Sequence, residues 1–331
     1  MLIPADGAER PGVVIVVYLV RRLALTFVLM FAVSTTIFMM LHMLPGDPVM
    51  AILGGIQSQP TMEQIEAIRH QLGLDEPLGV QYITWLSNLI RGDLGSSLIT
   101  SRPIIGDLAL RFPRTLQLVV SSLALSVPLG IGLGIVTAQL RGRGSDAIIS
   151  ATALVGFSTP VFVVALLMII VFSLQLDWFP SQGYYPPSQN LSDFLRSLVL
   201  PSIALAIGPI ASTMRLTRAA MVEQLGLDYV RTARSKGLPE RVVVYRHALK
   251  NALMPVVTVV GLQIGHMFGG SVIVESIFNW PGVGNFLIKA IIERDYPVVQ
   301  GVVLIIAGLF MLINLATDLF YAVLDPRIRV R

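Results

Sequence analysis

Six long apolar stretches of this chain carry few or no charged residues, and each can cross a lipid bilayer as a helix. The hydrocarbon core of a bilayer is about 30 Å thick, which about 20 helical residues span. Only 13% of all residues are charged, against about a quarter in soluble domains. The sequence therefore predicts an all-α, polytopic membrane protein with six transmembrane helices. These lie at about 23–44, 116–140, 147–174, 198–214, 252–274 and 298–323.

The basic residues predict how these spans are oriented. Arg21 and Arg22 precede the first span, and 16 of the 24 Lys and Arg fall in segments on their side of the membrane. Because Lys and Arg accumulate in cytoplasmic loops, we expect both termini in the cytoplasm and a multi-pass protein of the cytoplasmic (inner) membrane. The net charge of +4 could suggest nucleic-acid binding, but in a membrane chain it more often marks cytoplasmic loops.

The spans divide the chain into segments. We expect a cytoplasmic N-terminus at 1–22, the first span at 23–44, an external segment of small helices at 45–115, a core of spans two to six at 116–323 with a cytoplasmic loop at about 215–250, and a cytoplasmic tail at 324–331. Residues 13–20 are also apolar, and joining them to the first span would make it too long for an untilted helix. We therefore expect a short interfacial helix there.

The external segment contains three start signals for small helices that lie on the membrane. Thr61 and Gln64 have the spacing of a capping box, in which each side chain bonds the other residue's backbone N–H. Pro77 can open a second helix, with Val80, Ile83, Leu86 and Ile90 on one side. A third is expected from Pro103 to Phe112.

Several kinds of chemistry are missing from the sequence. There is no cysteine, and none of the four histidines has the spacing of a zinc protease, so no metal site is expected. Neither the GxxxxGK[ST] phosphate loop nor the G-x-S-x-G nucleophile elbow occurs. We expect no enzyme activity and no cofactor in this chain, so any energy must come from another protein.

Small residues inside the spans predict close helix packing. Glycines repeat every four residues, a spacing that lets helix backbones approach in lipid. They are Gly130 and Gly134 in the second span, and Gly261, Gly265 and Gly269 in the fifth. Pro160 should kink the third span after Gly156. Small and polar residues of spans two to five are candidates for a translocation path, namely Ser126, Thr159 and Gln263.

Ionisable residues near the spans are few. Glu275 follows the fifth span, His266 lies inside it, and Asp318 lies toward the inner end of the sixth. Charges in a membrane are costly and often functional. Two alternatives stay open: an ion or proton site, or helix packing and a salt bridge, for example between Asp318 and Arg215 or Arg218.

The basic segment 228–255, "DYVRTARSKGLPERVVVYRHALKNALMP", interrupts this apolar chain. A helix is expected at Tyr229–Lys236, with a left-handed stop at Gly237 and a second helix from Pro239 to about Leu249. A solvated loop would need no ordered turn, and a DNA-binding helix-turn-helix could not enter a groove while tethered at both ends. The pattern favours a docking knob for a cytoplasmic partner.

This segment resembles the "EAA" loop of B-type permease subunits from dipeptide, oligopeptide and nickel ABC importers. Ala233 and Gly237 match the motif's alanine and glycine, whereas Arg231 and Thr232 stand where most relatives have Glu-Ala, and the acidic residue is Asp228. The resemblance extends to "YLVRRLALT", "HMLPGDPV", "QLGLDEPLGVQYITWLSNLIRGDLGSSL", "RFPRTLQL", "VVESIFNWPGVG" and "RDYPVVQGVVL", and to "DLFYAVLDPRIR" at the end. It covers nearly everything after about residue 16.

The resemblance implies a type I ABC importer permease fold. It implies a complex with a second, C-type permease, one or two cytoplasmic ATPase subunits that carry ATP and Mg²⁺, and an external, often lipid-anchored, substrate-binding protein. The ATPase-coupling residues would be Asp228, Arg231, Thr232, Ala233, Arg234, Lys236, Gly237 and Arg241.

Peptides are the cargo that the resemblance implies most directly. Nickel chelates, glutathione and haem-like ligands are the alternatives for the same architecture. A secondary transporter is the main rival class. It would need paired charges or broken repeats at the midplane, and neither is evident in the sequence.

Overall fold

The computed structural model describes residues 11–43, 49, 61–71 and 73–324, and this part contains helices and no β-strand. The all-α prediction is therefore confirmed. In chain order the helical elements are α1 (Pro11–Met43), α3 (Met62–Gln71), α4 (Leu78–Ile90), α5 (Ile104–Gln139), α6 (Gly144–Ser158), α7 (Val161–Met168), the π-helix η2 (Ile169–Gln175), α8 (Leu191–Leu225), α9 (Asp228–Ser235), α10 (Glu240–Val242), the π-helix η3 (Val243–Ala248), α11 (Leu249–Ile277), α12 (Val283–Glu293) and α13 (Tyr296–Leu324).

Five continuous helical runs of the described part are long and apolar enough to cross a membrane. They are Val20–Met39 within α1, all of α5, all of α8, the run Glu240–Ile277 formed by α10, η3 and α11, and Tyr296–Thr317 within α13. A sixth span arises if α6 and the α7–η2 helix are counted together. The predicted set of six apolar segments is thus confirmed, with the third one broken.

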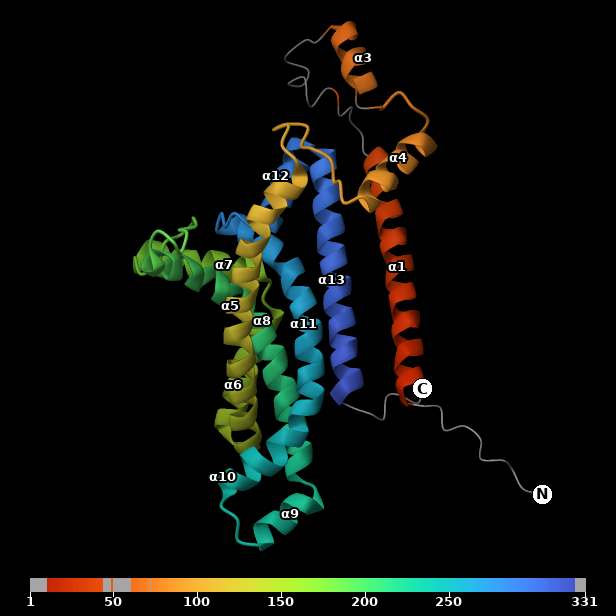
Figure 1. Ribbon diagram of the computed structural model, residues 1–331. Helices are drawn as coiled ribbons and strands as arrows, with labels where there is room; N and C mark the ends of the chain where they lie inside the picture. Colours follow the sequence, from red (N-terminus) through yellow and green to blue (C-terminus); the bar gives the residue numbers. More distant parts are fainter. Residues whose placement is uncertain (1–10, 44–48, 50–60, 72, 325–331) are drawn as a thin grey trace, which may run out of the picture.

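The break in the third span is sharper than the predicted kink. α6 and the α7–η2 helix meet at an angle of 103°, so the second half projects sideways from the bundle (Figure 1). Pro160 lacks a backbone N–H and disfavours helical geometry in the residue before it. Thr159 is accordingly extended, with φ −80° and ψ 124°, and α6 ends at Ser158.

Two expected boundaries are wrong. α1 runs without interruption from Pro11 to Met43. Residues 13–20 therefore belong to the same helix as the first span and form no separate interfacial helix. No glycine or proline after Gly12 interrupts α1. The third small helix likewise does not exist on its own, because α5 continues from Ile104 through Pro113 to Gln139. Ile104 and Leu108 pack against α12 and α13, which offsets the hydrogen bond that Pro113 cannot donate.

The capping box of α3 is confirmed. The backbone N–H of Thr61 donates to Gln64 Oε1 at 3.0 Å, and the N–H of Gln64 donates to Thr61 Oγ1 at 3.3 Å. The helix ends before Gly73, which has a left-handed φ of 64°.

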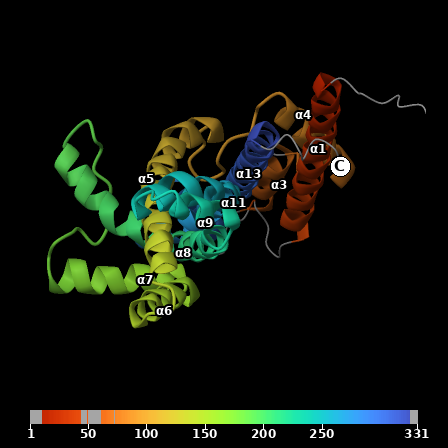
Figure 2. The same ribbon diagram turned by 90° about the horizontal axis from the view of Figure 1, so that it is seen from below.

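The elements gather at two ends of the bundle, which we call the α9 end and the α12 end (Figure 1). The start of α1 and the end of α13 lie toward the α9 end, while α3, α4 and α12 lie toward the other. Viewed along the bundle, α5, α8 and α11 are central, α1 lies beside α13 at one edge, and α7 extends away on the opposite side (Figure 2).

Glycines lie where helices approach most closely. A Cβ at Gly134 would come within 2.5 Å of Thr217 Cβ and 2.8 Å of the Met214 oxygen, and a Cβ at Gly130 within 2.7 Å of Thr213 Cβ, all on α8. A Cβ at Gly261 would come within 2.6 Å of Thr317 Cγ2, and a Cβ at Gly265 within 2.7 Å of the Phe310 ring, both on α13. At Gly269 a Cβ would meet nothing within 4 Å, so this glycine does not contribute to the contact.

We predict that Gly134→Val lowers the stability of the protein, because the new side chain must push α5 away from α8. Overpacking of this kind costs about 1–3 kcal/mol. Gly132→Val is the matched control, since a Cβ at Gly132 meets nothing within 4 Å. The measurement is the apparent melting temperature of each detergent-solubilised variant by size-exclusion chromatography. Equal melting temperatures for the two variants would contradict this view of the packing.

Candidate functional site

The basic segment forms the predicted helix, tight turn and helix. α9 ends at Ser235, Gly237 takes a left-handed φ of 75°, and Pro239 precedes the next helix. The prediction that this second helix ends near Leu249 is wrong. The helix continues through η3 and α11 as one helical run, Glu240–Ile277. The α9 loop, residues 226–239, is therefore attached directly to the fifth span.

One face of α9 packs on its own chain. Val230 and Ala233 are buried at 0% and 5% exposure, in a cluster with Val243 and Val244 of η3. The same cluster includes Ile135 and Ala138 of α5 and Met221 of α8. Ala233 thus permits close approach of α9 to η3, and its side chain is not available to a partner.

The charged residues of the α9 loop and of α10, which follows it, divide into two groups. Arg234 donates to both carboxylate oxygens of Glu240, at 3.1 and 2.7 Å, and so closes the turn at Gly237. Arg231 lies 3.4 Å from Asp228, with both side chains exposed. Lys236 and Arg241 are exposed and make no ion pair within the described residues. Of the expected cationic contacts, these two are the ones left available to an acidic partner.

A tyrosine that the sequence pattern did not single out holds the loop to the spans. The hydroxyl of Tyr229 donates to Gln224 Oε1 at 2.8 Å and accepts from Asn251 Nδ2 at 3.2 Å. Gln224 belongs to α8 and Asn251 to α11, so one side chain of α9 connects both helices. Such a contact between distant residues has no periodic signal in the sequence.

A membrane pocket lies where the third span breaks. It has a volume of about 540 Å³ and is lined by α6, α7, α8 and α11. Its polar lining residues are Thr159, Ser212, Gln263 and His266. Thr159 and Gln263 of the expected path are thus brought together. Ser126 is not among the lining residues; it is buried on α5, where its hydroxyl donates to the Leu123 oxygen at 3.4 Å.

Hydrogen bonds at this pocket connect α8 to α11. Gln263 donates through Nε2 to Ser212 Oγ at 2.6 Å and accepts from Thr213 Oγ1 at 3.2 Å. Gly208 and Pro209 also line the pocket, one turn earlier on α8. The Gly-Pro pair inside an apolar run was the sequence signal that could have located this wall.

Glu275, at the α12 end, fastens the end of α11 to two other helices. Its side chain is 0% exposed. One carboxylate oxygen accepts from Thr115 Oγ1 of α5 at 2.6 Å, and the other accepts from the backbone N–H groups of Gly284 and Asn285 at 2.7 and 3.0 Å. The last two groups belong to the first turn of α12, where a negative charge is stabilising.

Two glycines at the junction of α11 and α12 have no room for a side chain. A Cβ at Gly282 would overlap the Glu275 carboxylate, and one at Gly284 would overlap the backbone of Val272. Trp280, 0% exposed, donates its indole N–H to the Arg114 oxygen at 2.9 Å. The segment "ESIFNWPGVGN" is therefore a packed joint.

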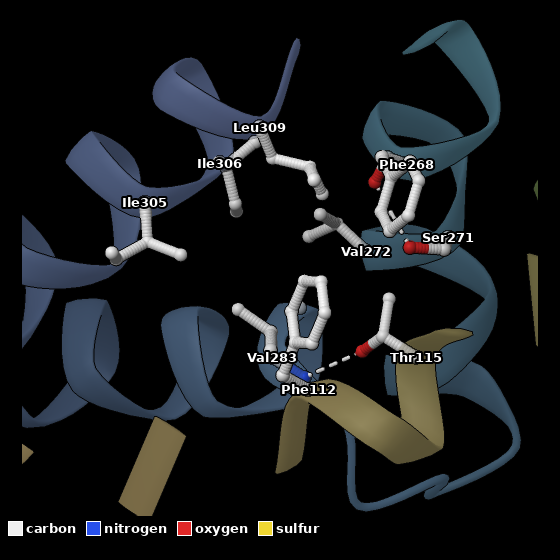
Figure 3. A pocket seen from close by; sticks show the side chains of 10 residues that line it. Phe112, Thr115, Phe268, Ser271, Val272, Val283, Ile305, Ile306 and Leu309 are labelled. Atoms are coloured by element: carbon white, nitrogen blue, oxygen red, sulfur yellow. Dashed lines mark hydrogen bonds between the residues drawn. The ribbon is translucent and has the colours of Figure 1, made fainter. Parts of the chain in front are cut away.

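Thr115 completes the joint by accepting a hydrogen bond from the Val283 N–H at 2.9 Å, as Figure 3 shows. The space between Thr115, Phe112 and Phe268 is a cavity of about 10 Å³, about enough for a single water molecule. The geometry fits the helix-packing alternative for Glu275, because every contact of its carboxylate goes to α5 or α12.

Arg218, one of the two partners suggested for Asp318, forms an ion pair with a different acidic residue. Arg218 donates to both oxygens of Asp146, at 2.9 and 2.7 Å, and so ties α8 to α6. Arg215 lies over the Phe157 ring, 4.1 Å from its centroid. The side chain of Asp318 lies outside the described residues. Arg218 thus pairs with Asp146, and the suggested pair of Asp318 with Arg215 or Arg218 stays a prediction.

Comparison with known proteins decides the family. Residues 130–330 match the binding-protein-dependent transport system inner membrane component, and residues 15–119 match the N-terminal part of such membrane components. The chain belongs to this family. It is therefore a multi-pass permease component of the inner membrane, as the resemblance implied, and it works with a binding protein.

Relatives match over almost their whole length. A putative peptide permease protein of Brucella ovis is 44% identical over 316 residues, which cover 95% of this chain and 99% of the relative. A probable peptide ABC transporter permease protein of Sinorhizobium fredii is 40% identical over 313 residues, with the same coverage. The glutathione transport system permease protein of Escherichia coli K12 is 41% identical over 314 residues, again covering 95% and 99%.

A solved structure, the crystal structure of an amino acid ABC transporter with histidines, has a TM-score of 0.49 at 18% identity. The match covers 67% of this chain and 94% of that one.

We predict that Glu275→Ala loosens the joint at the α12 end. The change leaves the N–H groups of Gly284 and Asn285 without their acceptor, at about 1–3 kcal/mol for each buried group left unpaired. Glu275→Gln is the matched control, because its amide oxygen can still accept from α12 and its NH₂ can donate to Thr115. Thermal unfolding in detergent should rank wild type, Gln and Ala in falling stability. An Ala variant as stable as wild type would refute the assigned role.

Proposed function

We propose that this chain is the peptide-translocating permease subunit of an ATP-driven importer, with the α9 loop and both termini in the cytoplasm. The observation that carries the proposal is the α9 loop: an exposed, basic helix-turn-helix that is continuous with a pocket-lining span. The relatives' names support short peptides as cargo, and glutathione, itself a tripeptide, is the second candidate. The concentration of Lys and Arg at the α9 end supports the orientation.

The proposed partners follow from what the chain has and lacks. The sequence contains no phosphate loop, so ATP would bind to one or two separate cytoplasmic ATPase subunits. An external binding protein would deliver the cargo at the α12 end. A second, C-type permease would cover the apolar α7–η2 arm, whose exposed side chains are Phe162, Leu166, Leu167, Ile170, Val171 and Leu174.

The proposed coupling uses the continuous helix from the loop to the pocket. The 38 residues of Glu240–Ile277 span about 57 Å at 1.5 Å per residue. A movement of the ATPase against α9 would shift this helix as a rigid body. Gln263 and His266 lie on the same helix and line the pocket, so ATP binding would change the pocket's opening. Lys236 and Arg241 would hold the acidic partner.

The test of the function is uptake by the reconstituted complex in proteoliposomes. With ATP enclosed in the liposomes and binding protein outside them, the complex should take up labelled di- or oligopeptides. Vanadate should abolish this uptake. Glutathione and nickel chelates, tested in parallel, distinguish the cargo alternatives. Uptake that survives vanadate and instead needs a proton or sodium gradient would refute the proposal in favour of a secondary transporter.

We predict that Gly237→Val uncouples ATP hydrolysis from transport. A β-branched side chain disfavours the left-handed φ of 75° at this position, so the turn must rearrange while the spans stay intact. Gly144→Val is the matched control, because Gly144 is exposed, has no left-handed φ, and a Cβ there meets nothing within 4 Å. Uptake per ATP hydrolysed should fall several-fold in the first variant only. Wild-type coupling in Gly237→Val would contradict the prediction.

We predict that Gln263→Leu lowers peptide uptake without lowering assembly. The change removes the polar groups that face the pocket while keeping side-chain volume similar. Ser126→Ala is the control, because Ser126 is a polar residue of the spans that lies outside the pocket lining. Uptake rate and recovery of the purified complex are measured for both. If the two variants transport alike, the pocket does not carry cargo.

A further inference from the structure

α4 exposes an apolar stripe that nothing in the described structure covers. Ile83 and Ile90 are 67% and 79% exposed, and Leu86 lies between them on the same helical face. The opposite face presents Gln81, Thr84 and Asn88. The 13 residues of α4 include no Asp, Glu, Lys or Arg.

The remaining side of α4 packs against α1 at a depth that the contacts define. The hydroxyls of Tyr82 and Thr35 are 2.6 Å apart. The Phe38 ring lies 5.2 Å from that of Tyr82 and 5.5 Å from that of Trp85, between ring centroids.

Both α1 residues belong to the candidate span Val20–Met39. α1 itself continues to Met43, so at 1.5 Å per residue Thr35 lies about 12 Å and Phe38 about 7.5 Å before the end of this helix. α4 therefore lies beside the upper part of a membrane-crossing helix and not beyond it.

We propose that α4 is an interfacial helix immersed in the lipid leaflet at the α12 end. Ile83, Leu86 and Ile90 lie among the acyl chains, while Thr84 and Asn88 face headgroups and water. Gln81, on the same side, donates to the Glu76 oxygen at 2.7 Å. Helices of this kind bury an apolar face about 5–10 Å into the boundary between headgroups and acyl chains. Contact with Thr35 and Phe38, both inside the candidate span, places α4 at the level of the membrane.

Lipid, and not another protein, is the occupant that fits the surroundings. α1 and α4 lie together at the edge of the bundle (Figure 2). α1 itself exposes Phe27 at 75% and Phe31 at 49% along the same span. The stripe of α4 continues this lipid-facing surface at the level where the span ends. Its polar stripe carries amides and a hydroxyl without charge, which suits the headgroup layer.

The immersed helix would fix the height of the external segment above the bilayer. After α4, the chain is held again where Asp295 accepts hydrogen bonds from Ser97 Oγ and the Leu98 N–H, at 2.5 and 3.1 Å. α4 is thus the lipid contact of a segment whose other end is fastened to the start of α13. This inference depends on the spans alone and does not require the proposed cargo or partners.

The experiment uses the absence of native cysteine, which makes every introduced one unique. Single variants of the full chain, Ile83→Cys, Leu86→Cys, Ile90→Cys, Thr84→Cys and Asn88→Cys, receive a nitroxide spin label and are reconstituted in phosphatidylcholine nanodiscs. Collision rates with oxygen, which partitions into lipid, and with a neutral nickel chelate, which stays in water, are measured by EPR. Phe27→Cys on α1 is the lipid reference and Glu66→Cys on α3 the water reference.

We expect a several-fold higher oxygen-to-nickel collision ratio at 83, 86 and 90 than at 84 and 88, with the first three close to the Phe27→Cys reference. Two results would overturn the proposal. High nickel collision at 83 and 90, as at Glu66→Cys, would place α4 in water. Low collision with both reagents would mean that protein, for example a second copy of this chain, covers the stripe.

Discussion

The bilayer's inability to hydrogen-bond the backbone constrains this structure more than any side-chain contact. Each unpaired N–H or C=O in hydrocarbon costs several kcal/mol, so crossing segments must be helices and irregular backbone must line a cavity or be covered by protein. The described chain follows this rule. Its long spans are unbroken except after Ser158, and that break forms a wall of the 540 Å³ pocket. The irregular backbone at the break thus lines a cavity, as the rule requires.

The same constraint explains how the few buried charges are arranged. The Glu275 carboxylate accepts hydrogen bonds from a threonine hydroxyl and two backbone N–H groups. Asp146 accepts two hydrogen bonds from Arg218. Each of these carboxylates links two or more helices. Burial of an ionised group is costly unless it is paired in this way. Charge inside this protein therefore fastens helices to one another, while Lys236 and Arg241 beside the α9 turn are exposed and make no ion pair within the described residues.

Local chemistry made part of this structure predictable. Hydropathy located the six apolar segments, Gly237 and Pro239 predicted the turn of the α9 loop, and Thr61 with Gln64 predicted the start of α3. Features that depend on packing between distant residues were missed or misjudged. α5 absorbs an expected separate helix because Ile104 and Leu108 pack on α12 and α13, and Ala233 turns inward because η3 lies behind it. The contacts of Tyr229 with Gln224 and Asn251, and the 103° bend at Pro160, likewise depend on packing that no local pattern shows.

The hydrogen bonds from Gln263 to Ser212 and Thr213 suggest how a polar cargo can enter an apolar membrane at low cost. If α8 and α11 separate in an empty pocket, an amide and two hydroxyls lose their partners. A peptide bond carries the same donor and acceptor as the glutamine amide, so it can take over these contacts one for one. If the pocket carries cargo as proposed, opening and loading would then be an exchange of hydrogen-bond partners, which a purely apolar solute could not make.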